Sequence, residues 1–248
     1  MRTSTAGVMA IASHEGIVLS PYLDSVGVWT LGIGHTAAAG FPDPKTFKGS
    51  LMLGEAIGMF RHDLLKYEDA VNKAVKVPLK QYEFDALVSF HYNTGAIGKA
   101  SFVKKLNAGD RAGALKGIMD WRKPAEIIPR RTVERDLFKT GKYPEPVATI
   151  YPAVNGKVQW KQGKRVDLAS ALNASPAPEP ISTGPISGPP SLGTPIPSAI
   201  SPAKPVAPPV VAKPDIGIPI TEQKQPVKRS LWAALADLIS KLFGRKPS

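Results

Sequence analysis

The chain has 248 residues, with 32 Lys and Arg against 20 Asp and Glu, so its formal net charge is +12; it contains no cysteine. This length fits one or two domains with a buried core. The lack of cysteine excludes a disulfide scaffold, a thiolate nucleophile and a thiolate metal site. The positive charge favours a polyanionic partner, such as nucleic acid, an anionic lipid surface or an acidic wall polymer.

Membrane insertion and secretion are not expected from the sequence. No apolar run approaches the roughly 20 residues that a spanning helix needs. The mildly apolar stretch near the N-terminus is short, and His14 and Glu15 interrupt it where a cleavage region would lie. We therefore expect neither a transmembrane helix nor a signal peptide.

Residues 1–145 are predicted to form one folded domain of the α+β class. Residues 19–34 combine β-branched and aromatic residues with turn formers, which predicts short strands joined by tight turns. After them, apolar residues recur at spacings of three and four from Leu53 to Val75, which predicts a long helix ended by Pro78. Further helices are expected over 81–92, from Asp110 to Trp121, and over about 130–138.

The rest of the chain divides into three further segments. Residues 146–170 are ambiguous: Asn155-Gly156 favours a hairpin, but the segment could also begin a linker, which we favour. Residues 171–226 hold 15 of the 25 prolines and no Phe, Trp or Tyr, which is typical of a disordered, extended linker. Residues 227–248 predict a basic amphipathic helix that needs a surface to lie on.

Three polar residues near the N-terminus form a candidate catalytic set. Glu15 is expected at the end of a short helix, Asp24 nine residues later in a turn, and Thr30 six residues further on a strand. If these elements fold back on one another, a carboxylic acid, a carboxylate and a hydroxyl face one cleft. Cleavage of a glycosidic bond needs such a set, because one acid protonates the leaving oxygen while a second group acts on the opposite side of the sugar.

These residues resemble the phage-type lysozymes, which are endolysins with muramidase activity. The spaced pattern of residues that characterises this family is matched between residues 15 and 35. The matching residues are Glu15, Gly16, Tyr22, Asp24, Gly27, Thr30, Gly32, Gly34 and His35. Further matching motifs follow in the same order, including Leu106-Asn107, Trp121 and Arg130-Arg131. The resemblance covers roughly residues 8–143.

The resemblance implies a lysozyme-like fold, with a small N-terminal β-sheet lobe, a larger helical lobe and a cleft between them. It also implies hydrolysis of the β-1,4 bond between N-acetylmuramic acid and N-acetylglucosamine in peptidoglycan, and hence lysis of a host cell. Glu15 would be the general acid, with a pKa raised by a partly apolar setting. Asp24 would stabilise the transition state or activate water, and Thr30 would hold that water, usually in an inverting reaction.

Three supporting residues and several rival functions accompany this assignment. Arg130 would approach the catalytic acid or be ordinary solvated helix charge; Tyr22 would line the sugar site or pack internally; His35 would support the cleft through a hydrogen bond. A lytic transglycosylase, a non-hydrolytic wall-binding module and a membrane-active protein are the alternatives. We expect no metal, no cofactor and no nucleic acid as partner, because the four His show no zinc-ligand spacing and no nucleic-acid motif is visible.

The family also implies a cellular route. The protein would be a monomer made in the host cytoplasm without a signal peptide and would act in the periplasm or wall after a holin opens the membrane. Residues 228–246 would bind an anionic membrane surface, or else dock on a protein partner or on the domain itself.

Overall fold

The computed structural model describes residues 1–174, so the predicted linker from residue 175 and the amphipathic tail lie outside the described residues. The helices are α1 (Thr5–Ser13), α2 (Leu53–Ala74), α3 (Gln81–Thr94), α4 (Ser101–Asn107), α5 (Arg111–Ile118), α6 (Ile128–Thr140) and α7 (Leu168–Ala174). The strands are β1 (Gly16–Leu23), β2 (Trp29–Gly32), β3 (His35–Thr36), β4 (Val147–Ile150), β5 (Ala153–Val154), β6 (Lys157–Val158) and β7 (Lys164–Asp167).

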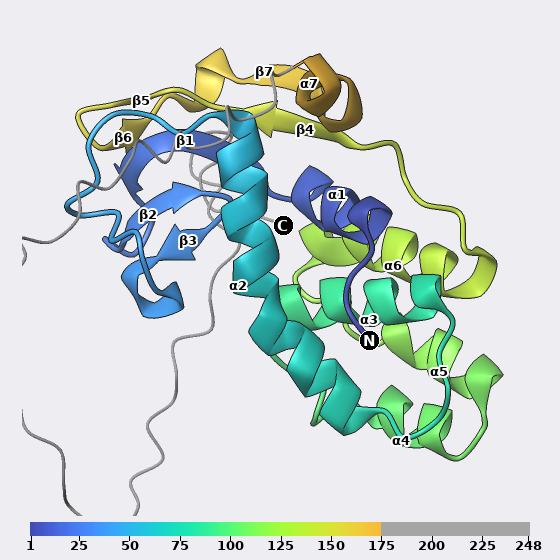
Figure 1. Ribbon diagram of the computed structural model, residues 1–248. Coiled ribbons are helices and arrows are strands. Elements are labelled where there is room, and N and C mark those ends of the chain that lie inside the picture. Colours follow the sequence, from blue (N-terminus) through green and yellow to red (C-terminus); the bar gives the residue numbers. More distant parts are fainter. Residues whose placement is uncertain (175–248) are drawn as a thin grey trace, which may run out of the picture. The chain divides into compact units, whose positions relative to one another are not determined.

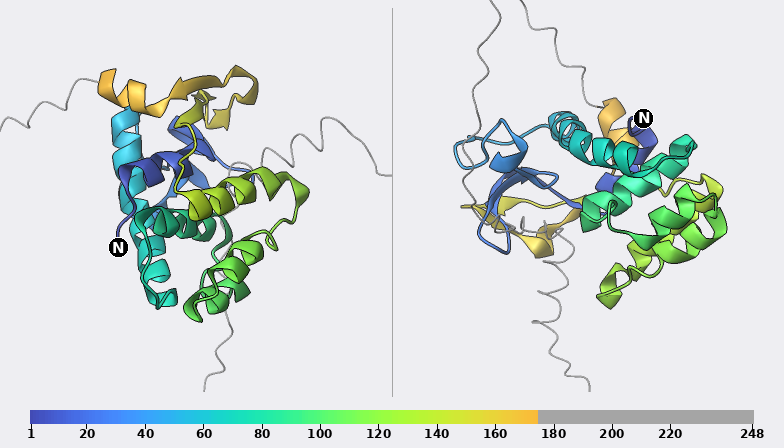
Figure 2. Two further views of the ribbon diagram at one scale, coloured as in Figure 1. Left: turned by 90° about the vertical axis from the view of Figure 1, so that its right-hand side faces the viewer. Right: turned by 90° about the horizontal axis from the view of Figure 1, so that it is seen from below.

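The long helix α2 lies between a lobe of strands and a lobe of helices (Figure 1). In the right-hand view of Figure 2, strands β1 to β3 lie at one end of the described domain and helices α3 to α6 at the other. The predicted α+β arrangement of a strand lobe and a larger helical lobe is therefore confirmed, and it has the lysozyme-like layout.

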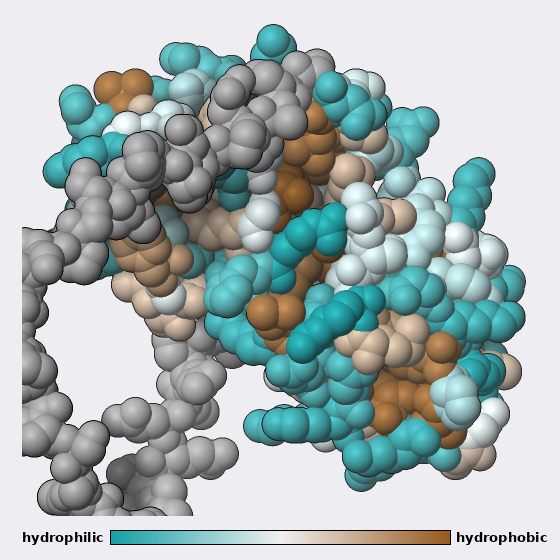
Figure 3. All heavy atoms as spheres, in the orientation of Figure 1, coloured by the Kyte–Doolittle hydropathy of each residue, from teal (hydrophilic) through white to brown (hydrophobic). Residues whose placement is uncertain are grey.

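The helical lobe is held by an apolar core to which the predicted stripe of α2 contributes. Phe60 and Leu64 of α2 and Phe84, Leu87 and Phe102 of the following helices are at most 1% exposed. Trp121 is only partly buried and packs edge-on against Phe90 of the core. On the face shown in Figure 3, the surface of this lobe is mostly hydrophilic, with a smaller hydrophobic area over α4 and α5.

Helix ends follow local sequence signals. Asp110 is the N-cap of α5, where its side chain accepts a hydrogen bond from the Gly113 amide, but this helix ends at Ile118 rather than at Trp121 as predicted. Gly95 and Gly141 end α3 and α6 in the left-handed conformation that glycine adopts without strain. The short helix α4 has no counterpart in the prediction.

The sheet corrects the interpretation of residues 146–170. It has five strands in the order β3-β2-β1-β4-β7, in which β4 runs parallel to β1 and antiparallel to β7. The preference for a linker start in this segment was therefore wrong, because two of its strands complete the sheet. Asn155-Gly156 does form the expected hairpin turn, but it joins the short strands β5 and β6 rather than longer ones. Helix α7 extends the described structure past residue 170.

None of the helices in the described part of the chain is both long and apolar enough to cross a membrane.

Candidate active site

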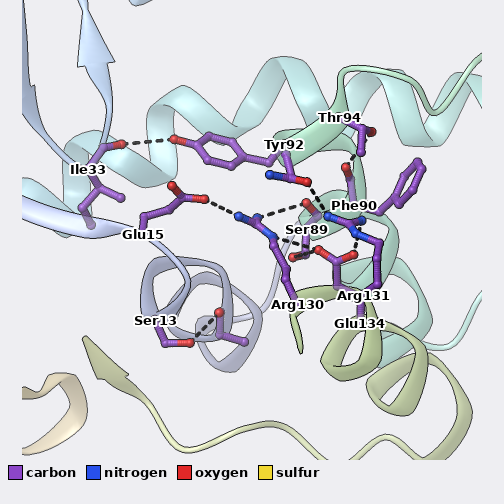
Figure 4. Close-up of polar contacts among 12 residues, drawn as sticks. Ser13, Glu15, Ile33, Ser89, Phe90, Tyr92, Thr94, Arg130, Arg131 and Glu134 are labelled. Atoms are coloured by element: carbon purple, nitrogen blue, oxygen red, sulfur yellow. Dashed lines mark hydrogen bonds and ion pairs between the residues drawn. The ribbon is translucent and has the colours of Figure 1, made fainter. Parts of the chain in front are cut away.

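Glu15 lies where α1 ends and β1 begins, and its side chain is directed toward the helical lobe (Figure 4). It is 5% exposed. The guanidinium of Arg130 in α6 donates a hydrogen bond from Nη1 to Glu15 Oε1 over 2.5 Å. The expected apolar setting is therefore only partly found, because one side of the carboxyl group faces a buried cation.

Arg130 belongs to a buried charge network around Glu134. Its Nε donates to Glu134 Oε1 over 3.0 Å, and Ser89 Oγ donates to the same oxygen over 2.7 Å. Arg131 pairs with the other carboxylate oxygen of Glu134 and donates to Asn93. The alternative of solvated helix charge is wrong, because Arg130 is 5% exposed and Arg131 is fully buried.

The network keeps both guanidinium groups inside the fold. Burial opposes the charge of Arg130, but the carboxylates of Glu15 and Glu134 outweigh this effect and raise its pKa. For Arg131 burial dominates and lowers the pKa, although Glu134 partly offsets it. Arginine remains protonated in proteins in either case, so Glu15 faces a permanent positive charge.

Asp24 occupies the turn that connects β1 to β2. Its Oδ1 accepts hydrogen bonds from the backbone amides of Val26 and Val28 over 2.9 and 2.8 Å. The Asp24 amide donates to the Val28 carbonyl, so the turn is closed by its own backbone. Among residues 1–174 no group donates to Asp24 Oδ2, which leaves this oxygen available to solvent or a ligand.

Thr30 lies on β2, directly opposite Tyr22 of β1 in the antiparallel pair. Its hydroxyl donates to the Val28 carbonyl over 3.1 Å. Burial raises the pKa of the Tyr22 phenol, the charges of Asp24 and Glu15 raise it further, and a hydrogen bond with Thr30 lowers it. Thr30 thus lies on the second strand of the hairpin whose turn carries Asp24, and Glu15 directly precedes the first strand of that hairpin.

Tyr22 is 1% exposed. Of its two predicted roles, the buried position favours internal packing over a surface that a sugar could contact.

His35 connects the strand lobe to α2. Its Nδ1 lies 2.9 Å from Asp63 Oδ2 and its Nε2 lies 2.9 Å from the Pro42 carbonyl oxygen. The residue is 1% exposed. Asp63 was missed by the sequence interpretation, although a carboxylate within the apolar stripe of α2 is a signal that could have found it.

Gly32 and Gly34 form the tight turn between β2 and β3, with φ values of +64° and +73°. A Cβ on Gly34 would lie 2.9 Å from the Tyr92 hydroxyl, and one on Gly32 would lie 2.8 Å from Met59 Cε. Tyr92 Oη donates to the Ile33 carbonyl within this turn. The positive φ values and the packing of protein side chains thus account for glycine at both positions.

A small pocket of about 90 Å³ opens beside Arg130, lined by His14 and by residues before and within the start of α6. Burial, together with the charges of Arg130 and Arg131, lowers the pKa of His14 to about 3. Burial also lowers the pKa of His91 to about 4. Both imidazoles are therefore neutral in the folded protein at neutral and mildly acidic pH.

The lowered pKa values of His14 and His91 predict that the folded protein loses stability in acid. Between pH 6.5 and about 4 the unfolded chain binds protons at both rings while the folded protein does not, so stability is complete above pH 6.5 and falls as the pH is lowered. His14→Asn is expected to remove about 2 kcal/mol of the difference in unfolding free energy between pH 7 and pH 4.5, allowing for partial exposure. Urea unfolding at a series of pH values measures it.

The matched control is His62→Asn, since His62 is exposed on α2. This substitution should change the unfolding free energy by less than about 0.5 kcal/mol at both pH values, as for surface substitutions generally. An unchanged pH dependence in the His14 variant would contradict the prediction.

Known proteins match this chain over the region that holds the candidate site. The phage lysozyme family model matches residues 12–134. The endolysin of Acyrthosiphon pisum secondary endosymbiont phage 1 is 33% identical over 151 residues, a match that covers 56% of this chain and 99% of that protein.

Two solved structures have the same fold. The endolysin of Escherichia coli O157:H7 phage FAHEc1 is 33% identical with a TM-score of 0.52, covering 58% of this chain and 97% of that one. The muramidase domain of SpmX from Asticaccaulis excentricus is 32% identical with a TM-score of 0.50, covering 56% and 98%. The chain is thus similar to these three proteins over nearly their whole length, and it belongs to the phage lysozyme family.

Proposed function

We propose that this chain is a muramidase in which Glu15 is the general acid and Asp24 and Thr30 position and activate the attacking water. Its activity is that of the lysozyme-type glycoside hydrolases, and its substrate is peptidoglycan. The bond that it cuts is the β-1,4 linkage between N-acetylmuramic acid and N-acetylglucosamine. The observation that supports these roles best is the β1–β2 hairpin, which begins directly after the buried Glu15 and carries Asp24 in its turn and Thr30 on its second strand.

The proposed reaction assigns one step to each group. Glu15, in its protonated form, donates to the glycosidic oxygen as the bond to the anomeric carbon breaks. Asp24 Oδ2 accepts a proton from a water molecule that attacks from the opposite face of the sugar, while the turn amides hold Oδ1 in place. Thr30 orients that water through its hydroxyl. The cleft that admits the glycan and the inverting outcome belong to this proposal.

Arg130, His35 and Tyr22 have supporting roles in the proposal. The hydrogen bond from Arg130 restricts the rotamers of Glu15, which fixes the direction in which the acid donates. The contact of His35 with Asp63 ties β3 to α2 and so holds the strand lobe against the helix between the lobes. Tyr22 lies opposite Thr30 in the β1–β2 pair and supports it by packing.

A lytic transglycosylase is the second candidate, because such enzymes need a single acid and form an anhydro sugar without water. The carboxylate and hydroxyl opposite Glu15 favour water as the acceptor. We therefore expect muropeptides released from purified sacculi to carry reducing N-acetylmuramic acid ends, each heavier by one water than the anhydro form. Mass spectrometry distinguishes the two products, and predominantly anhydro ends would refute the hydrolytic assignment.

For the basic tail, we propose binding to an anionic membrane surface through residues 228–246. The support is in the sequence, where an apolar face at helical spacing is flanked by Lys and Arg. In a co-sedimentation assay with anionic vesicles, the full chain should bind while a shortened chain ending at Pro226 should stay in solution. Equal binding by both chains would contradict the proposal. A holin as the route to the wall and a monomeric state also remain proposals.

A further inference from the structure

The β5–β6 hairpin, which follows the family match, lies against residues 24–28, the turn between β1 and β2 that we call the catalytic turn. The family model ends at residue 134, whereas residues 147–167 add β4 and β7 to the sheet and place the β5–β6 hairpin beside β1. We call residues 147–167 the sheet extension. Figure 1 shows β5 and β6 near β1 and β2 in the strand lobe.

One residue of this hairpin contacts both flanks of the turn that carries Asp24. The Leu23 amide donates a hydrogen bond to the Gly156 carbonyl over 2.8 Å. On the other flank, a Cβ on Gly156 would lie 3.0 Å from Cη2 of the Trp29 ring. Leu23 directly precedes Asp24 in the sequence, and Trp29 directly precedes Thr30.

The hairpin is itself held in a defined position. Asn155 and Gly156 have φ values of +50° and +73°, which is the geometry of a two-residue type I′ turn. At the base of the extension, the Tyr151 amide donates to the Ile17 carbonyl over 2.8 Å, which continues the pairing of β4 with β1. The β5–β6 turn presents the Gly156 carbonyl to Leu23 of β1. The segment that carries this turn is anchored to β1 as well, through Ile17.

Apart from this contact, the catalytic turn is supported at its base by the pairing of β1 with β2, in which Leu23 faces Trp29 and Tyr22 faces Thr30. Residues 25–28 are all exposed, and Val26 is 64% exposed. The hydrogen bonds within the turn close it locally but do not fix its position relative to Glu15, which lies at the opposite end of β1. A small displacement of Asp24 or Thr30 would separate the water from the sugar, and misplacement by about 1 Å can cost a hundredfold in rate.

We propose that the sheet extension fixes the position of the catalytic turn, with Gly156 as the positioning residue that contacts both of its flanks. The inference rests on the proposed function, since it concerns the alignment of Asp24 and Thr30 with Glu15. Glycine is needed at this position for two reasons, the positive φ and the Trp29 ring against its α-carbon.

The test is Gly156→Ala, with Gly141→Ala as the matched control. Gly141 has the same φ of +73°, and a Cβ there would lie 2.9 Å from Cδ1 of the Tyr82 ring, but it ends α6 in the helical lobe. Both substitutions should lower the melting temperature. At a temperature well below both melting transitions, G156A should lower kcat on peptidoglycan sacculi about tenfold with KM within about twofold, whereas G141A should keep both constants.

A kcat for G156A equal to that of G141A would overturn the proposal, because the extension would then contribute only to stability. A rise in KM at unchanged kcat would also overturn it, since it would indicate a substrate-binding role. Glu15→Gln in the same assay tests the proposed function separately: an active E15Q enzyme refutes the catalytic assignment whatever the glycine variants show.

Discussion

Replacing Glu15 with Gln is expected to lower the rate of sacculus hydrolysis by a factor of about 10² to 10⁴, the usual contribution of a general acid. The amide keeps the shape of the side chain but cannot donate the proton that the leaving sugar needs. Because Arg130 keeps its bond to Glu134, the variant should fold. Loss of turbidity of purified sacculi gives the rate, and circular dichroism checks the fold.

Glu126→Gln provides the control for this prediction. Glu126 is exposed and lines the small pocket beside Arg130, so the same chemical change is made nearby without touching the proposed acid. Its rate should stay close to that of the wild type, because Glu126 has no part in the proposed reaction. An E15Q variant that keeps more than a tenth of the wild-type rate would contradict the assignment of Glu15.

The largest loss of stability is expected from Glu134→Gln. The side chain of Glu134 is 2% exposed and faces the guanidinium groups of both Arg130 and Arg131. Without its charge, two buried cations share the single carboxylate of Glu15. Breaking a buried ion pair from one side costs about 3–5 kcal/mol, because the remaining charge is left without compensation.

Asp136→Asn is the matched control for Glu134→Gln. Asp136 lies on the same helix and pairs with Arg135, but the two side chains are 50% and 33% exposed. Its loss should change the unfolding free energy by less than about 0.5 kcal/mol, since solvent screens the pair. Urea unfolding at pH 7 measures both variants. Equal effects of the two substitutions would show that the buried network contributes no more than a surface pair.

The helices of the helical lobe were predictable because the sequence signals for a helix and for its end are local. The apolar spacing of α2 and the glycines after α3 and α6 report their elements within a few residues. The candidate acid, carboxylate and hydroxyl were found by their spacing within sixteen residues and by resemblance. Such signals can be recognised in the sequence because turn chemistry and helical periodicity act over short stretches of chain.

Features that depend on distant contacts were missed. Residues 147–150 look like an isolated strand in the sequence, and nothing local indicates that they pair with residues 16 and 17. The buried network is similar, since Glu134 meets Ser89 across 45 residues. The spacing of Arg130 and Glu134 by four in a helix could have indicated their pairing, but burial of the pair depends on how α6 packs on α3.

We propose that Glu15 and Asp24 act on opposite faces of one glycosidic bond. A crystal structure of the E15Q protein with a bound peptidoglycan tetrasaccharide tests it most directly. The claim predicts that the amide of residue 15 contacts the glycosidic oxygen between N-acetylmuramic acid and N-acetylglucosamine, with a water molecule between Asp24 and the anomeric carbon. A tetrasaccharide bound with no linkage near residue 15, or with both side chains on the same face of the sugar, would contradict it.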